Sequence, residues 1–211
     1  MVHISKGKVK ANPMQVMYKK SFAGLCSLVI LYTMGLAQEP QTILRAPKGW
    51  NSEIISFPLG FAPSIDFVGF EDIRFAPGWA DPSSEQFWTY HFVWFIEKKD
   101  NMDEEILTET LTRYYDGLMQ AVLTELSDTT HSDTLDKTLC LFVQTDEGFT
   151  GKIRVFDAFF TKEPITLNVK VKEYMCKETN KQAIAFDISP QGFDHKVWQR
   201  FKEIQLIVEC N

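Results

Sequence analysis

His91 is the side chain of this sequence that is best suited to chemistry near neutral pH. It lies in the aromatic run Phe87–Glu97, on the mixed face that it shares with Thr89. An imidazole on an otherwise apolar strand is a candidate general base or ligand-binding group. The alternative is a half-buried histidine whose ring is hydrogen-bonded to the backbone. Because the sequence contains no nucleophile elbow, phosphate-binding loop, zinc-binding helix or dinucleotide fingerprint, His91 is a catalytic candidate without a motif.

Aromatic residues are dense from Trp50 to Trp79 and in the strand that follows. Rings can line a pocket for an apolar molecule, but they also dominate core burial, so packing is the alternative. Arg74 can stack on rings and bind a carboxylate or phosphate, or it can form an internal ion pair with Glu71 or Glu53. We predict a ligand site between the sheet and the segment from Trp50 to Trp79, with these residues: Arg74, Trp79, Trp88, Tyr90, His91 and Trp94.

His131 and His195 do not indicate a metal-binding site. His131 lies in the polar loop Ser127–Asp136, whose acidic spacing does not match an EF-hand, and a solvated loop is the simpler interpretation. His195 follows Asp194, whose position at the start of a short helix is explained by capping. The sequence therefore predicts neither a metal nor a cofactor.

The cysteines indicate one disulfide at most beyond the first 37 residues. That part of the chain has three, Cys140, Cys176 and Cys210, and no C-x-x-C pair. Cys176 and Cys210 each end a predicted strand and are the candidate pair. Cys140 lies inside an apolar predicted strand, and we interpret it as a small core residue.

Residues 1–37 have the order of a secretory signal peptide. Five lysines without an acidic residue precede an uncharged, mostly apolar run from Ser21 to Met34, and small residues follow up to Ala37. The run is shorter than the roughly 20 apolar residues of a membrane span. We predict cleavage near Ala37 and a periplasmic or extracellular protein that meets the membrane only through this peptide. The alternatives are an uncleaved anchor or a buried helix.

The charge of the chain argues against a nucleic-acid partner. The full sequence has a formal net charge of −6, and residues 38–211 retain 17 basic residues against 28 acidic ones, a net charge of −11. Binding to phosphate backbones needs clustered Lys and Arg, which a chain this acidic does not favour. Acidity of this degree favours solubility as its explanation, and recognition of a partner through acidic residues is the alternative.

Hydrophobic periodicity predicts an α+β fold, in which an antiparallel sheet packs over one long helix within a single domain, residues 50–211. The helix extends to about Leu126 and is capped by Asn101, and a shorter helix follows Asp194. Residues 38–49 are expected to be a flexible lead-in. The predicted strands are Ile54–Phe57, Glu71–Phe75, Phe87–Glu97, Thr138–Gln144, Lys152–Phe160, Ile165–Tyr174, Gln182–Ile188 and Ile204–Cys210.

Four short motifs carry a resemblance to other proteins. They are Phe-Pro-Leu-x-Phe-Ala-Pro from Phe57, Gly-Phe-Glu from Gly69, Arg-Phe-Ala-Pro-Gly-Trp from Arg74 and Phe-Trp-x-Tyr-x-Phe-Val-Trp from Phe87. The chain resembles a group of uncharacterised exported bacterial proteins that share this pattern. The resemblance implies export and a bacterial source, and it assigns no catalytic residue.

These observations favour an exported protein that binds a small apolar or amphipathic ligand in an aromatic-lined pocket. One alternative is a hydrolase or isomerase that uses His91 with nearby acidic residues. Another is an envelope assembly protein whose exposed aromatic residues form an interface. The sequence does not distinguish these three classes, and it leaves the oligomeric state open.

Overall fold

The computed structural model describes residues 42–98, 101–126 and 136–210 of the 211-residue chain. The description below concerns the compact unit formed by residues 38–211. The predicted signal peptide, residues 1–37, and His131 lie outside the described residues.

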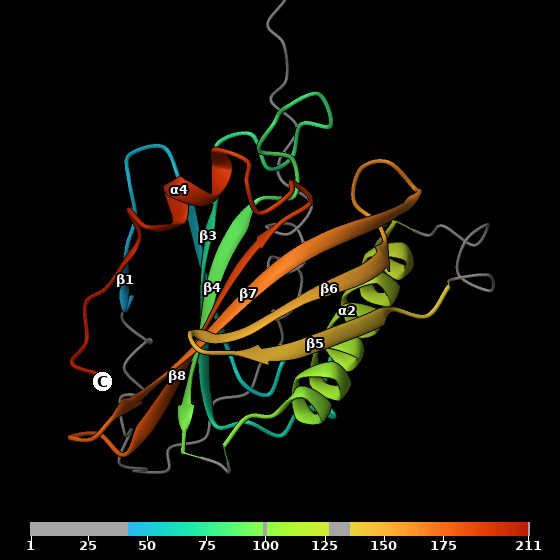
Figure 1. Cartoon of the computed structure of the whole chain (residues 1–211). Coiled ribbons are helices and arrows are strands. Elements are labelled where there is room, and N and C mark those ends of the chain that lie inside the picture. Colours follow the sequence, from blue (N-terminus) through green and yellow to red (C-terminus); the bar gives the residue numbers. More distant parts are fainter. Residues whose placement is uncertain (1–41, 99–100, 127–135, 211) are drawn as a thin grey trace, which may run out of the picture. The chain divides into compact units, whose positions relative to one another are not determined.

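A seven-stranded sheet, antiparallel throughout, dominates this unit (Figure 1). One long helix, α2 (Glu104–Glu125), packs against it, and a short helix, α4 (Val197–Phe201), lies near the C-terminus. The predicted α+β class is therefore confirmed. In spatial order the strands are β2 (Asn51–Ser56), β3 (Gly69–Phe75), β4 (Tyr90–Glu97), β8 (Lys181–Ser189), β7 (Pro164–Cys176), β6 (Gly148–Phe156) and β5 (Leu139–Thr145).

Helix α2 begins at a side-chain cap, in which a carboxylate accepts a hydrogen bond from a backbone amide that has no acceptor within the helix. Asp103 is extended, and its Oδ1 accepts a hydrogen bond from the Ile106 amide at 2.8 Å, with two glutamates in the first turn. The cap is therefore Asp103, two residues after the predicted Asn101. Near the middle, Gly117 allows the loop after β2 to approach, since a Cβ there would lie 2.1 Å from the Phe61 carbonyl oxygen.

The two faces of the sheet are covered by different elements. Tyr90, Phe92 and Trp94 of β4 face α2, and the rings of Phe92 and Tyr114 stack at 5.8 Å. We call this the helix face. The opposite face, here the outer face, carries His91 and the cluster Ile43, Leu44, Phe70, Val93, Phe95, Cys176 and Ala183, against which the C-terminal segment packs.

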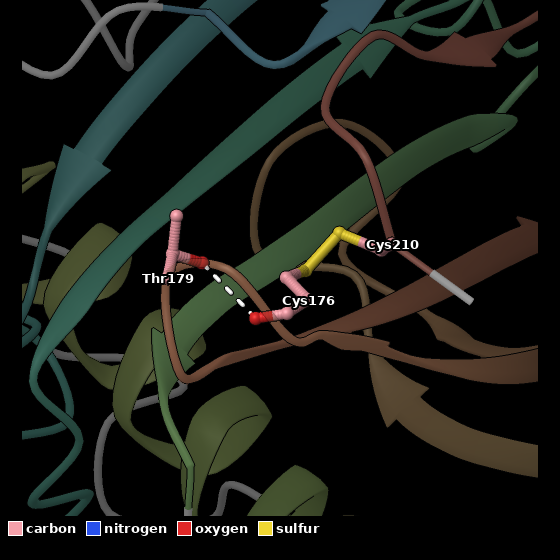
Figure 2. Close-up of a disulfide and its surroundings, with 3 residues drawn as sticks. All are labelled: Cys176, Thr179 and Cys210. Carbon is pink, nitrogen blue, oxygen red and sulfur yellow. Dashed lines mark hydrogen bonds between the residues drawn. A yellow bond between two sulfur atoms is a disulfide. The ribbon is translucent and has the colours of Figure 1, made fainter.

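A disulfide between Cys176 and Cys210 fixes the C-terminal segment on the outer face (Figure 2). Cys176 ends β7 and is buried. Figure 2 also shows the Thr179 hydroxyl donating to the Cys176 carbonyl, at 3.3 Å, in the turn that follows. These two cysteines are the pair that the sequence indicated, and Cys140 is a free thiol on β5.

The described part of the predicted flexible lead-in, residues 42–49, is attached to the rest of the unit by hydrogen bonds. Leu44–Arg45 forms β1, which pairs with β9 (Gln205–Leu206), and the Ile43 and Leu44 amides donate to Asp72 at 2.8 and 3.2 Å. These two amides satisfy acceptors of the buried Asp72 carboxylate, and the same hydrogen bonds hold the segment from Ile43 to Arg45 in place. The last strand is also shorter than predicted, ending at Leu206 and not at Cys210.

Strands β4 and β6 have different limits from those predicted. Strand β4 begins at Tyr90 because Trp88 has a left-handed φ of 50° and the Thr89 amide bonds back to the Gln86 carbonyl. Strand β6 starts at Gly148 and ends at Phe156, because the buried Asp157 then organises a turn.

Candidate functional site

The six predicted ligand-binding residues lie in three different environments. Arg74 and His91 point to the outer face, directly opposite each other on β3 and β4. Trp94 lies on the helix face beside Glu71. Trp79, Trp88 and Tyr90 gather at one end of the sheet. The structure therefore does not bring the six residues together in one site: three gather at the end of the sheet, and Arg74 and His91 form a separate pair on the outer face.

On the outer face, Arg74 and His91 are both bonded to carboxylates. His91 Nδ1 lies 2.8 Å from Asp187 Oδ1 on β8, and 8% of His91 is exposed. Arg74 is buried and pairs with Asp72, while its guanidinium also donates to the Leu44 carbonyl at 2.8 Å. An internal ion pair is thus the role of Arg74, with Asp72 as the partner instead of Glu71 or Glu53.

The outer-face geometry limits what His91 can do chemically. Its imidazole has a carboxylate to orient it, as a general base requires. Within the described part of the chain, however, no serine or cysteine side chain is hydrogen-bonded to it, and no acid or histidine cluster suits a metal ion. Glu71 points to the helix face because adjacent residues on a strand alternate. His91 and Glu71 cannot therefore act together as an acid–base pair.

The helix face buries a carboxyl group among aromatic rings. Glu71 has no exposed surface; its Oε2 accepts from Trp94 Nε1 at 2.6 Å and its Oε1 accepts from the Tyr114 hydroxyl at 2.9 Å. The neighbouring Tyr90 and Tyr115 hydroxyls bond to each other. The rings of Phe57 and Phe67 enclose Trp94 at 6.3 and 5.5 Å.

Burial changes the protonation of this group. Desolvation raises the pKa of Glu71 to about 7, although the hydrogen bonds from Trp94 and Tyr114 oppose it. Burial likewise raises the pKa of Glu53 on β2 to about 7. The pKa values of Tyr90 and Tyr114 are raised above their ordinary value, again mainly by burial. Near pH 7 the helix face thus contains two carboxyl groups poised to titrate.

Replacing Glu71 with glutamine is expected to remove part of the pH dependence of stability. The raised pKa means that the folded protein holds the Glu71 proton between about pH 4.5 and 7 while the unfolded chain releases it. Wild-type stability therefore falls as pH rises through this window, by about 3 kcal/mol from Glu71 alone. A glutamine amide can replace the protonated acid, since it can accept from Trp94 and donate to the Tyr114 oxygen.

Urea unfolding of wild type and Glu71→Gln at pH 4.5, 6 and 8 checks this expectation. The variant should gain stability relative to wild type as pH rises and should be the more stable protein at pH 8. Curves that stay parallel across the three pH values would contradict the proposed burial of a titrating carboxyl.

Five rings from distant parts of the sequence meet at one end of the sheet. We call them the aromatic cluster: Trp79, Trp88, Tyr90, Phe159 and Phe160. Trp88 lies 5.8 Å from Phe159 and 6.1 Å from Tyr90, and Trp79 lies 5.2 Å from Phe160, as measured between ring centroids. Trp79, Trp88 and Tyr90 are buried, whereas Phe159 and Phe160 are half-buried. The two phenylalanines therefore form the outer wall of the cluster.

The indole N–H of Trp88 is a donor without a partner. Only 1% of Trp88 is exposed, and within the described residues Nε1 has no hydrogen-bond acceptor. Its backbone is left-handed, with φ at 50°, which is uncommon for a bulky residue. An unpaired buried donor costs about 1–3 kcal/mol, and strained residues concentrate at functional sites. Trp88 thus combines two features that indicate a binding site.

Sequence reasoning missed Phe159 and Phe160 because it placed them at the end of a strand. They lie instead on a turn held by Asp157, whose Oδ1 accepts from both of their amides, at 3.0 and 3.1 Å, and whose Oδ2 accepts from the Thr161 amide at 2.9 Å. An aspartate with a threonine four residues later is a usable turn signal. Nothing local could have indicated which rings this turn would meet.

Comparison of the chain with protein-family models, curated proteins and solved structures found no match. Among the described residues, no helix has the length and apolar character needed to cross a membrane.

Proposed function

We propose that this chain is an exported bacterial protein that binds a small apolar or amphipathic molecule at the aromatic cluster. The observation that carries the proposal is the buried Trp88 indole N–H, which has no acceptor among the described residues. A ligand oxygen there would satisfy this donor, while Phe159 and Phe160 would contact the apolar part of the ligand.

Export is supported by two independent features. The disulfide between Cys176 and Cys210 is typical of proteins from oxidising compartments such as the bacterial periplasm. The order of basic, apolar and small residues before Gln38 is that of a signal peptide. Cleavage near Ala37 would leave residues 38–211 as the mature protein.

The ligand chemistry follows from the two kinds of group at the cluster. Ring faces and edges favour aliphatic or aromatic carbon, and the Trp88 N–H favours one oxygen acceptor. Phe159 and Phe160 lie on a turn whose base is fixed by Asp157, and rotation of these two half-buried rings would open the cluster to a ligand. An alcohol, ketone or carboxylic acid with an apolar body fits both requirements.

Replacing Trp88 with phenylalanine tests the proposal, because it removes the N–H and keeps a ring. We expect the indole proton of Trp88 to shift in ¹H–¹⁵N spectra when decanoic acid is added, and Trp88→Phe to weaken binding at least tenfold. Trp50→Phe is the matched control, since the buried Trp50 Nε1 also has no partner among the described residues but lies beside Phe201 of α4. Equal affinities in all three proteins would contradict the proposal.

Assembly through strand β5 is a second candidate function. β5 is one of the two edge strands of the seven-stranded sheet, carries no charged residue, and exposes Leu139, Leu141 and Val143 by 62%, 69% and 52%. Natural edge strands are usually protected by charge or proline. In an acidic chain an uncharged edge can pair with the same edge of a second copy without repulsion, over Leu139–Val143. This candidate predicts a dimer in a native mass spectrum and is rejected by a monomer.

A further inference from the structure

The outer face of the sheet is exposed along β5, β6 and β7, the strands drawn in front of α2 in Figure 1. Side chains alternate along these strands, so Phe142 and Ile153 are buried on the helix face while their neighbours point the other way. Lys152 lies opposite Leu141, and Lys170 lies opposite Thr150. The outer face of these strands therefore carries a set of exposed apolar and basic side chains: Leu139, Leu141, Val143, Lys152, Arg154, Lys170 and Lys172.

Four of these side chains form a band of positive charge, which we call the basic band: Lys152 and Arg154 on β6, and Lys170 and Lys172 on β7. Two residues apart on one strand, neighbouring cations are separated by about 7 Å and repel each other. In the described spans of β5, β6 and β7, no acidic residue alternates onto this face. The band is therefore a local excess of one charge.

The basic band is not neutralised by ion pairs. Arg154 lies 3.8 Å from Asp136 and Lys172 lies 3.4 Å from Glu147, but all four side chains are largely exposed, so water screens both pairs. The other two lysines of the band have no ion-pair partner among the described residues. Since residues 38–211 have a net charge of −11, an anionic surface is attracted to this face and repelled by the rest of the chain.

Apolar side chains flank the basic band on both sides. On β5, Leu139, Leu141 and Val143 are exposed by 62%, 69% and 52%, and pairing of the β5 edge with a second copy would use its backbone and leave them on the face. On the other side Phe193 is 41% exposed, and Lys170 Nζ lies 5.3 Å from the centroid of its ring. Apolar side chains beside Lys and Arg are typical of surfaces that lie at a membrane interface.

We propose that the outer face of β5, β6 and β7 binds the surface of a membrane that contains anionic lipids. The basic band would contact the phosphate headgroups, and the leucines of β5 and Phe193 would enter the interfacial region. Lysine accounts for three of the four cations and is depleted in protein–protein interfaces, which favours lipid over a protein partner. This contact would add to that of the predicted signal peptide, because the cations cluster only once the strands are paired.

Co-sedimentation with lipid vesicles tests this surface. Residues 38–211, the compact unit described above, are used so that the signal peptide cannot itself bind lipid. Vesicles of phosphatidylglycerol and phosphatidylcholine in equal parts are compared with vesicles of phosphatidylcholine alone. Lys152→Gln combined with Arg154→Gln removes half of the band. Lys98→Gln combined with Arg113→Gln is the control with the same charge change, since Arg113 is exposed on α2 and Lys98 follows β4.

A second pair of variants tests the apolar part of the surface. Leu141→Ser removes the most exposed leucine of β5, and Val68→Ser is its control, because Val68 is 57% exposed just before β3. Circular dichroism melts verify that every variant folds.

We expect binding to the anionic vesicles that weakens as salt is added, and at least tenfold weaker binding to phosphatidylcholine alone. The Lys152 and Arg154 double variant should bind roughly tenfold more weakly than wild type and Leu141→Ser roughly threefold more weakly, while both controls match wild type. Trp88→Phe should also match wild type, so this surface and the aromatic cluster are tested separately.

Three results would overturn the proposal. The first is equal binding to the two kinds of vesicle, and the second is an equal loss in the double charge variant and its control. The third is unchanged binding of Leu141→Ser together with equally tight binding of polyglutamate, which would indicate a surface for acidic polypeptides and not for lipid.

Discussion

Replacing Asp72 with asparagine is expected to lower the free energy of unfolding by about 3–5 kcal/mol. Asp72 is fully buried and Arg74 is 4% exposed, so the substitution leaves a guanidinium without a counter-ion in the sheet. Asp72 Oδ2 also accepts from the Ile43 amide at 2.8 Å and the Thr42 hydroxyl at 2.8 Å. Asparagine keeps one acceptor oxygen but turns its NH2 group either toward Arg74 or toward these donors, so the lost charge and the lost hydrogen bonds act in the same direction.

Urea unfolding at pH 7 measures this loss. Glu109→Gln is the matched control, because Glu109 pairs with Arg113 at 2.9 Å on the exposed surface of α2 and its loss should cost less than about 1 kcal/mol. Adding Arg74→Gln to Asp72→Asn should recover part of the stability, since the unpaired charge is then gone. If Asp72→Asn and Glu109→Gln cost the same, the outer face does not bury an ion pair.

Removing the disulfide is expected to cost about 4 kcal/mol. Cys176 and Cys210 are separated by 34 residues, and chain entropy predicts a stabilisation of about 4 kcal/mol for a loop of this length. The bond also holds Ile204, Leu206 and Val208 against the outer-face cluster. Cys176→Ala combined with Cys210→Ala should therefore lower the urea midpoint and increase hydrogen exchange in β1 and β9.

Reductant provides the control for the disulfide. Wild type in dithiothreitol should unfold at the same urea concentration as the double alanine variant, and the variant should not respond to dithiothreitol. Cys140→Ala, which removes the free thiol, should leave that response intact. A wild-type midpoint that reductant does not move would contradict the stabilising role of the bond.

Much of the fold could be predicted because its patterns are local. The alternation from Ile165 to Tyr174 indicates a strand with one wet face, and the apolar spacing from Leu107 to Val122 indicates the helix. The start of β4 could not be predicted, because the left-handed backbone of Trp88 is imposed by its tertiary contacts and no glycine marks it.

The partner of Arg74 was predictable from strand geometry alone. Residues two apart on a strand share a face, so Arg74 points the same way as Asp72 and away from Glu71. The meeting of Trp88 with Phe159 was not predictable, because it joins residues 71 positions apart through the sheet order. The raised pKa of Glu71 was equally inaccessible, since burial between β3 and α2 produces it.

The most direct test of ligand binding is a native mass spectrum of the exported protein. The full chain is expressed in a bacterium, recovered from the periplasm, and weighed before and after denaturation. We predict the mass of residues 38–211 with an added mass that disappears on denaturation, and a smaller bound fraction for Trp88→Phe than for Trp50→Phe. Identical masses under native and denaturing conditions, together with no response of the Trp88 indole to decanoic acid, would contradict a ligand site at the aromatic cluster.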